Sequence, residues 1–346
     1  MANVIKVVLV SVLVLASMHA QSDRDRDYAI AKDNLYSTTM LKALEYFSKL
    51  AKEGDARGYK GLGDVYYFGG TGVESDLKKA FQYYQKAAKM GNVGAYVKLA
   101  GFYECGFKSG DFMVAKNLPK ALEYYHKAGK MGNSKAYLEL GSTYDFGNCA
   151  PKDIKKALQY YKQSALMGNV EACIILGGMY RSGRDVSKDT QKAIEYYQKA
   201  GESGHKHEIG EIFEARDGYL AIADMYVIGE GVPQDDQKAL EYYQKAYHSK
   251  ADAYEALGNA YRDHGTRMTR NLPASVRNIP KALKYLKKAA ELGSMDANTS
   301  LGDMYKRGEG VPKDYDKAVD YYWKACDLGD SGSCDEARGG RSYDGD

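Results

Sequence analysis

Two cysteines bracket a short glycine-rich stretch near the end of the 346-residue chain, in KACDLGDSGSC at residues 324–334. The tetrapeptide GDSG inside it is familiar from serine proteases, and two thiols at this spacing could also bind a metal or form a disulfide. A protease nucleophile needs a histidine and an aspartate held in geometry, and no histidine of the chain lies in a recognisable motif. A zinc site needs two further ligands, which the local sequence does not supply.

Three further stretches carry residue types that could do chemistry. The segment 205–217 (HKHEIGEIFEARD) could ligate a metal, although its H-x-H spacing suits a strand better than a helix and a solvated insertion also explains it. The pattern S-x-x-K of serine β-lactamases occurs at 75–78 and 203–206, but matches this short arise by chance. The basic insertion 262–281 could contact an acidic partner or form a solvated loop. We therefore expect no catalytic residues, no metal site and no cofactor.

The elements that carry these stretches belong to a repeat. Lys-Ala opens a recurring pattern at eight positions between Lys42 and Lys317, at intervals of 36 to 46 residues, as in KAIEYYQKA (192–200). Counted from the first alanine, the apolar and aromatic residues fall at 0, +3, +4, +7 and +8, which is one face of a helix. Such a period indicates stacked supersecondary units rather than two globular domains.

A second helix is predicted before each of these helices from the second copy onward. Its pattern has a small residue, Leu at +4, Gly or Ala at +5 and Tyr at +8, as in AYLELGSTY (136–144). A glycine inside a helix costs about 1 kcal/mol relative to alanine, so its recurrence needs a packing reason; it occurs at Gly63, Gly141, Gly177, Gly258 and Gly302. One hairpin cannot bury both of its faces, so the sequence predicts an all-α solenoid of stacked antiparallel helix pairs.

Charge and the N-terminal segment limit the class of protein. The chain has 49 basic and 46 acidic residues, a formal charge of +3, which gives no basic footprint for nucleic acid. Residues 1–20 combine Lys6, a short apolar run and a small residue at Ala20, which favours a secretory signal over a retained membrane anchor. We expect cleavage after Ala20, no transmembrane segment in the mature chain, and a secreted or periplasmic protein.

The pattern AxxxLGxxYxxGxGVxxDxxKAxxYYxKAAxxG is nearly complete at 297–329 and at 218–249, and on it the chain resembles the Sel1-like repeats, which are related to the tetratricopeptide repeat. The resemblance covers almost the whole mature chain. It implies a right-handed α-solenoid with a concave groove and a role as an adaptor or scaffold for other proteins. The expected organisation is a signal peptide (1–20), a capping segment with a degenerate repeat (21–54), seven repeats (55–329) and a C-terminal cap and tail (330–346).

The stretch KACDLGDSGSC more narrowly resembles the secreted, cysteine-rich bacterial branch of that family. There, a cysteine late in the second helix pairs with one early in the following helix, which implies a disulfide between Cys326 and Cys334. This bridge would hold the last helix pair, which no full repeat covers. Cys105 and Cys149 fall in regions that stacking places side by side, and we expect a second disulfide there. Cys173 is then left as a small buried side chain or a reactive thiol.

Candidate partner-binding residues lie at offset +6 of the first helices, opposite the packed face; they are Asp64, Ser142, Asp224, Asn259 and Asp303. Along one groove they would favour a basic or polar peptide, although a merely solvated face is also open. The sequence thus predicts a non-catalytic scaffold that binds a protein or peptide ligand in its concave groove. The alternative is a penicillin-binding or weakly β-lactam-hydrolysing protein, as some members of the cysteine-rich branch have been described.

Overall fold

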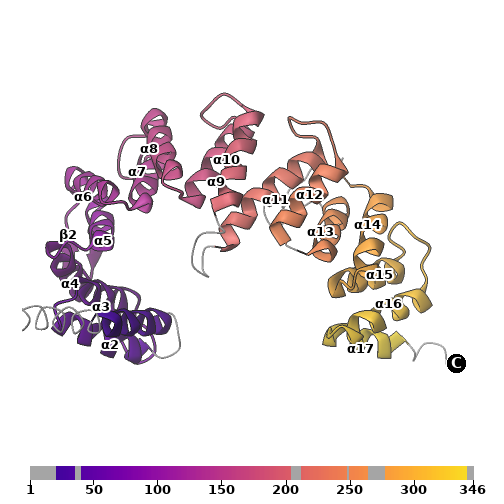
Figure 1. Ribbon diagram of the computed structural model, residues 1–346, viewed down its shortest axis with the longest axis horizontal. Helices are drawn as coiled ribbons and strands as arrows, with labels where there is room; N and C mark the ends of the chain where they lie inside the picture. Colours follow the sequence, from indigo (N-terminus) through magenta and orange to yellow (C-terminus); the bar gives the residue numbers. More distant parts are fainter. Residues whose placement is uncertain (1–20, 36–39, 204–211, 248, 264–276, 341–346) are drawn as a thin grey trace, which may run out of the picture. The chain divides into compact units, whose positions relative to one another are not determined.

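The computed structural model describes residues 21–35, 40–203, 212–247, 249–263 and 277–340. The chain divides into two compact units, Met1–Met167 and Gly168–Asp346, which are taken one at a time below. The described residues of both units are mainly helical (Figure 1). The predicted signal segment, residues 1–20, lies outside them. Over the part of the chain that the structure describes, no helix is both long and apolar enough to cross a membrane.

The N-terminal unit begins with a helix over residues 21–35. It continues with α2 (Met40–Lys52), α3 (Ala56–Phe68), α4 (Leu77–Lys89), α5 (Val93–Glu104), α6 (Leu118–Lys130), α7 (Ser134–Phe146) and α8 (Ile154–Leu166). Between α5 and α6, strands β1 (Phe107–Ser109) and β2 (Phe112–Val114) form an antiparallel hairpin, with Phe107 opposite Val114. This hairpin was not predicted from the sequence, and it enlarges the loop inside one helix pair.

The C-terminal unit continues the helical pattern. Its helices are α9 (Val170–Ser182), α10 (Thr190–Ser203), α11 (Ile212–Ile228), α12 (Asp236–Tyr247), α13 (Lys250–Asp263), α14 (Ile279–Glu291), α15 (Met295–Arg307), α16 (Tyr315–Asp327) and α17 (Ser331–Gly340). The last helix, α17, packs on α16 and buries Ala337 against it.

In both units, consecutive helices pack as pairs, and each pair contacts the next. The pairs are α3 with α4, α5 with α6 and α7 with α8 in the N-terminal unit, and α9 with α10, α11 with α12, α13 with α14 and α15 with α16 in the C-terminal unit. Within a unit, the second helix of one pair packs on the first helix of the next, as α4 does on α5 and α12 on α13. This serial arrangement confirms the predicted all-α solenoid of antiparallel helix pairs.

A polar side chain begins the second helix of several pairs. Asp76, Asp153 and Asp314 each accept a hydrogen bond from the backbone N–H three residues later, at 2.9, 3.0 and 3.0 Å. Asn117 and Asn278 cap α6 and α14 in the same way, and in these two helices a proline occupies the first turn. The caps satisfy N–H groups that a helix leaves without partners, and they fix where these helices start.

The two helices of a pair meet where a glycine of the first faces a tyrosine ring of the second. A Cβ added at Gly141 would lie 2.4 Å from the ring of Tyr161, and one at Gly177 would lie 2.6 Å from the ring of Tyr197. The same contact joins Gly63 with Tyr84 and Gly302 with Tyr322, whereas Gly258 faces Leu286. Close approach of the helices is therefore the packing reason for the repeated glycine.

Neighbouring glycines in α9 allow this contact to be tested. We expect Gly177→Ala to lower the free energy of unfolding by about 1–3 kcal/mol, because its Cβ would overlap the Tyr197 ring and overpacking outweighs the better helix propensity of alanine. The control is Gly178→Ala, whose Cβ would have Tyr197 Oη at 3.7 Å as its nearest neighbour. It should be neutral or stabilising by up to about 1 kcal/mol. Denaturant unfolding checks both, and equal effects would contradict the explanation.

Candidate functional site

Two cysteine pairs lie at disulfide distance. Cys105, the C-cap of α5, faces Cys149 in the α7–α8 loop with Cα atoms 5.1 Å apart, and Cys326 faces Cys334 at 4.8 Å. Both separations fall in the range of protein disulfides. Cys173 is fully buried, and burial raises the pKa of its thiol to about 11. The thiol therefore stays protonated at neutral pH and behaves as a small apolar side chain.

Two of the five candidate partner-binding residues are buried. Asp64 and Asp224 are 3% and 0% exposed. The hydroxyl of Tyr84 donates a hydrogen bond to Asp64 at 2.9 Å, and that of Tyr243 donates one to Asp224 at 2.5 Å. A buried tyrosine hydroxyl needs an acceptor, so these carboxylates complete the packing of their helix pairs. They do not have the exposed position that we expected for them.

The other three candidates are partly buried. Asp303 accepts hydrogen bonds from the Tyr322 hydroxyl at 2.7 Å and from Arg307 at 3.1 Å. Ser142 accepts a longer one, 3.4 Å, from a tyrosine hydroxyl of α8, and the Asn259 amide donates one of 3.4 Å within α13. Contact of these residues with a partner stays a prediction. The sequence did hold a signal for their inward bonds, since Asp64, Asp224 and Asp303 each precede a repeat tyrosine by 19 or 20 residues.

The other chemical candidates of the sequence make local contacts or are not described. The Ser75 hydroxyl donates to the backbone carbonyls of Tyr66 and Tyr67, and that of Ser203 donates to a carbonyl one turn earlier. The two histidines of the stretch 205–217 are His205 and His207, and they lie outside the described residues, which omit 204–211. Within the described ranges, no three His, Cys, Asp or Glu side chains gather in a way that could hold a metal ion.

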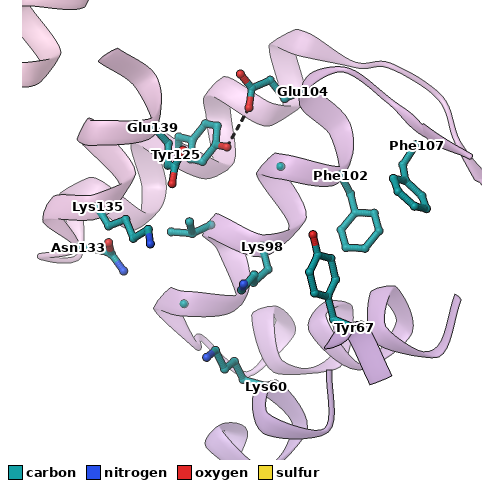
Figure 2. A pocket seen from close by; sticks show the side chains of 13 residues that line it. Lys60, Tyr67, Lys98, Phe102, Glu104, Phe107, Tyr125, Asn133, Lys135 and Glu139 are labelled. Carbon is teal, nitrogen blue, oxygen red and sulfur yellow. Dashed lines mark hydrogen bonds between the residues drawn. The ribbon is translucent and has the colours of Figure 1, made fainter. Parts of the chain in front are cut away.

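A pocket of about 570 Å³ opens on the N-terminal unit, and we call it the N-terminal pocket (Figure 2). Its lining comes from α3, α5, α6, α7 and β1. One wall is aromatic: the ring of Phe102 packs edge-on against Tyr67 and Phe107, with centroids 6.0 and 5.5 Å apart. The β-hairpin brings Phe107 to this wall, so the insertion within the repeat supplies part of the pocket.

Amino and amide groups line another part of the N-terminal pocket. Lys60 of α3, Lys98 of α5 and Lys135 of α7 come from three successive first helices, and Asn133 caps α7 beside them. Lys60 forms an ion pair with Asp64 at 2.5 Å. Burial lowers the pKa of Lys98, Asp64 opposes this, and the positive charges of Lys60 and Lys135 add to the lowering. Lys98 is therefore half-buried, and both amino groups and carboxylates surround it.

Glu104 lines another side of this pocket. The Tyr125 hydroxyl donates to Glu104 at 3.0 Å, and burial together with this carboxylate raises the pKa of Tyr125. Glu104 directly precedes Cys105, and Phe107 follows two residues later. The pairing of Cys105 with Cys149 thus anchors the chain that carries both lining residues.

In the C-terminal unit, Asp236 joins α12 to the two following helices. It accepts hydrogen bonds from the hydroxyls of Tyr261 and of Tyr285, the latter at 2.7 Å, and Lys281 of the predicted basic insertion lies 2.8 Å away. A pocket of about 340 Å³ adjoins this cluster. Burial alone would raise the pKa of Asp236, but the hydrogen bonds from Lys281, Tyr261 and Tyr285 outweigh it and lower the pKa. The cluster is a structural tie between helix pairs.

Comparison with protein families explains the repeated elements. Eight ranges match the family described as Sel1 repeat: 40–55, 56–92, 93–133, 134–169, 170–205, 217–249, 251–294 and 296–330. The chain belongs to the Sel1 repeat family. Lys60, Lys98 and Lys135 of the N-terminal pocket thus stand on three successive Sel1 repeats. Sel1 repeats form scaffolds that are typical of protein-interaction modules, and Sel1-repeat scaffolds are generally non-catalytic.

Solved structures of other Sel1 repeat proteins are similar to this chain. A Sel1 repeat protein from Oxalobacter formigenes is 26% identical, with 94% of this chain and 88% of that chain covered and a TM-score of 0.45. A protective antigen of uropathogenic Escherichia coli is 26% identical over 84% of this chain and 65% of that chain, with a TM-score of 0.39. Cysteine-rich protein B of Helicobacter pylori is 29% identical over 38% and 91%, with a TM-score of 0.29. No curated protein matches the sequence. The family assignment therefore rests on the eight sequence matches.

The Asp236 cluster predicts a pH-dependent stability. A carboxylate whose folded-state pKa is lowered contributes stability that is fully present above its unfolded pKa, about 4, and is lost as pH falls through the folded pKa. We expect Asp236→Asn to lower the free energy of unfolding by about 1–2 kcal/mol at neutral pH, with a difference from wild type that shrinks below about pH 4. Asp327→Asn, at an exposed position of α16, is the control. A difference that is already lost at about pH 6 would mean a raised pKa and contradict this assignment.

Proposed function

We propose that this Sel1 repeat protein is a non-catalytic adaptor that binds a segment of a partner protein in the N-terminal pocket. The observation that carries the proposal is the pocket itself, which combines an aromatic wall with amino groups from three successive first helices. Binding sites commonly combine apolar surface with a few placed polar groups. The pocket supplies both on regular helices, which hold their side chains in place without a ligand.

Preorganisation supports a binding role. The pocket lies against the core of its unit, where Phe102 and Leu99 are buried, so its aromatic wall needs little rearrangement to receive a ligand. The pairing of Cys105 with Cys149 further restrains the segment that carries Phe107. Restraint of this kind reduces the ordering entropy lost on binding. We therefore propose that the partner adapts to the pocket more than the pocket adapts to the partner.

We also propose that the protein works outside the cytoplasm, as a secreted or periplasmic protein. Two cysteine pairs at disulfide distance support this, because disulfides persist in oxidising compartments. The proposed organisation is a signal segment cleaved after Ala20, a capping segment to residue 54, repeats over 55–329 and a cap and tail beyond.

The proposed compartment predicts a defined thiol pattern. Peptide mapping without reductant, on protein recovered from secreting cells, should find Cys105 linked to Cys149, Cys326 linked to Cys334, and Cys173 as a free thiol. In the chain-entropy model the two bridges stabilise by up to ~4 and ~2.5 kcal/mol, since their residues are 44 and 8 positions apart. Cys149→Ser should therefore cost more stability than Cys334→Ser, and both differences should vanish in reductant. Free thiols at all five cysteines would contradict the proposed compartment.

The binding role can be tested by filling the pocket. Gly101 lines it, and a Cβ at this position would have Tyr125 Oη at 3.9 Å as its nearest neighbour. A leucine fits the helix backbone there and occupies pocket space. We expect peptides selected from a displayed random library on the wild-type chain to lose at least about tenfold in affinity for Gly101→Leu, since the pocket contacts worth about 1.4 kcal/mol or more are blocked.

Gly178→Leu is the matched control, because Gly178 occupies the same repeat position in the C-terminal unit and also has room for a Cβ. Both variants should keep the wild-type melting temperature or exceed it, since leucine is the better helix former. Selected peptides that bind Gly101→Leu as tightly as the wild-type chain would rule out the pocket as the binding site.

A further inference from the structure

We propose that the N-terminal pocket recognises an acidic peptide segment, with a side-chain carboxylate bound at Lys98 and an adjacent aromatic or large aliphatic side chain against Tyr67 and Phe107. The inference rests on the proposed function, because it names the chemistry of the segment that the pocket binds. It also differs from the sequence-based expectation of a basic or polar peptide.

Lys98 is the centre of this site. Its ammonium group lies over the ring faces of Tyr67 and Phe68, at 5.2 and 5.4 Å from the centroids, and the side chain is half-buried. Among the residues that the structure describes, no hydrogen bond or ion pair reaches this ammonium group. Lys79 and Lys317 offer a contrast, since each also lies near a tyrosine ring but is exposed and pairs with an aspartate. Asp64 and Glu139 act on Lys98 through their charge, but neither pairs with it directly. A half-buried cation without a directly paired anion is costly, and an incoming carboxylate would offset that cost.

The groups around Lys98 favour an anion as well. Burial lowers the pKa of Lys98; the charges of Lys60 and Lys135 add to the lowering, and those of Asp64 and Glu139 oppose it. Asn133 uses its side-chain oxygen to accept the Ala136 N–H at 3.1 Å, which turns its amide N–H groups outward as donors. Figure 2 shows Asn133 and Lys135 on one side of Lys98, with the aromatic wall on the other. A carboxylate beside Lys98 would meet several donors at once.

The carboxylates of the protein around this pocket are already bonded elsewhere. Glu104 accepts the hydroxyls of Tyr125 and, at 2.6 Å, of Thr143. Asp64 accepts the Tyr84 hydroxyl and pairs with Lys60. Glu139 acts on Tyr125, whose pKa it helps to raise, and Figure 2 places it beside that residue. Glu104 and Asp64 are thus held by internal hydroxyls, whereas Glu139 lines the pocket with Lys98 and Lys135 and acts on Lys98 through its charge.

The repeat does not require a lysine at this position. Lys98 directly precedes the buried repeat leucine of α5, Leu99. In the other repeats the equivalent residues are Gly61, Glu139, Ile175, Ala221, Ala256 and Ser300. Packing of the helix pair therefore tolerates small, apolar and acidic side chains at this site. The lysine at position 98 is therefore a feature of this pocket and not of the repeat fold.

The pocket suits a peptide segment better than a small anion. Its volume, about 570 Å³, holds several side chains, and a free inorganic anion would leave the aromatic wall of Tyr67, Phe102 and Phe107 uncovered. The lining spans three successive first helices and is open to solvent, so a chain can cross it without ending there. Within an extended segment, a side-chain carboxylate can bind the lysine while the adjacent aromatic or large aliphatic side chain covers the aromatic wall.

A double-mutant cycle tests the proposal on the full mature chain. The probes are peptides selected as above, synthesised with acetylated N-termini and amidated C-termini, together with copies in which Asp or Glu is changed to Asn or Gln. We expect Lys98→Met and the peptide change each to weaken binding at least about tenfold, and the combination to weaken it little further. Lys130→Met, at an exposed position of α6, removes the same charge and should bind like the wild-type chain. Lys98→Met should melt at or above the wild-type temperature, because it removes a half-buried charge.

The outcomes separate this inference from the proposed function. In one outcome, the selected peptides lose binding to Gly101→Leu but contain no excess of Asp or Glu, or they bind Lys98→Met normally. This outcome would overturn the acidic specificity and leave the binding role intact. Binding that requires a free C-terminal carboxylate, and is lost on amidation, would also overturn the side-chain assignment. If no selected peptide depends on Gly101, both proposals fall.

Discussion

The approach of a first-helix backbone to a second-helix tyrosine ring is the constraint on which the helix pairs depend. It demands a glycine or an alanine at one position, and it buries a hydroxyl that must find an acceptor. In three pairs the acceptor is an aspartate that directly follows the small residue; these are Asp64, Asp224 and Asp303. The small residue is a glycine before Asp64 and Asp303 and an alanine before Asp224. The pattern of small residue, aspartate and tyrosine is therefore one packing device, and its carboxylate is committed to the interior.

The N-terminal pocket exists where this device changes. Gly101 stands at the position that Asp64 occupies one repeat earlier, so no carboxylate fills the space next to the tyrosine hydroxyl. The Tyr125 hydroxyl turns to Glu104 instead, and the vacated volume becomes part of the pocket. A hairpin inserted in the same repeat then adds Phe107 to the wall. Two departures from the repeat pattern within one helix pair thus produce a concave site on an otherwise regular framework.

The periodic features could be predicted from the sequence and the departures could not. Helix faces, caps such as Asp153 and the adjacency of Cys105 and Cys149 all follow from repeat register, because one helix pair predicts the next. The hairpin strands have three residues each, too few for an alternating pattern to be recognised. The role of Asp224 was missed because its position on the helix indicates exposure, while the demand of the Tyr243 hydroxyl, 19 residues later, decides its burial. The periodicity of one helix face does not show which polar groups of two helices meet; the recurring spacing between aspartate and tyrosine was the signal that could have shown it.

Local charge placement has the same origin in departures from the repeat. The formal charge of +3 indicates no preference for an acidic or a basic ligand, because the basic and acidic residues are nearly balanced in number. Many of the lysines recur at fixed positions of the repeat. The lysine that opens each second helix lies over a tyrosine ring, as Lys238 does over Tyr226 at 5.2 Å. Several of these lysines, among them Lys79 and Lys317, also pair with an aspartate. Lys98 stands outside that arrangement. In a linear array each repeat contacts only its neighbours, so a surface that crosses three repeats is only as rigid as the junctions between them. The pairing of Cys105 with Cys149 crosses one of these junctions, and Glu104 and Phe107 on either side of Cys105 line the pocket.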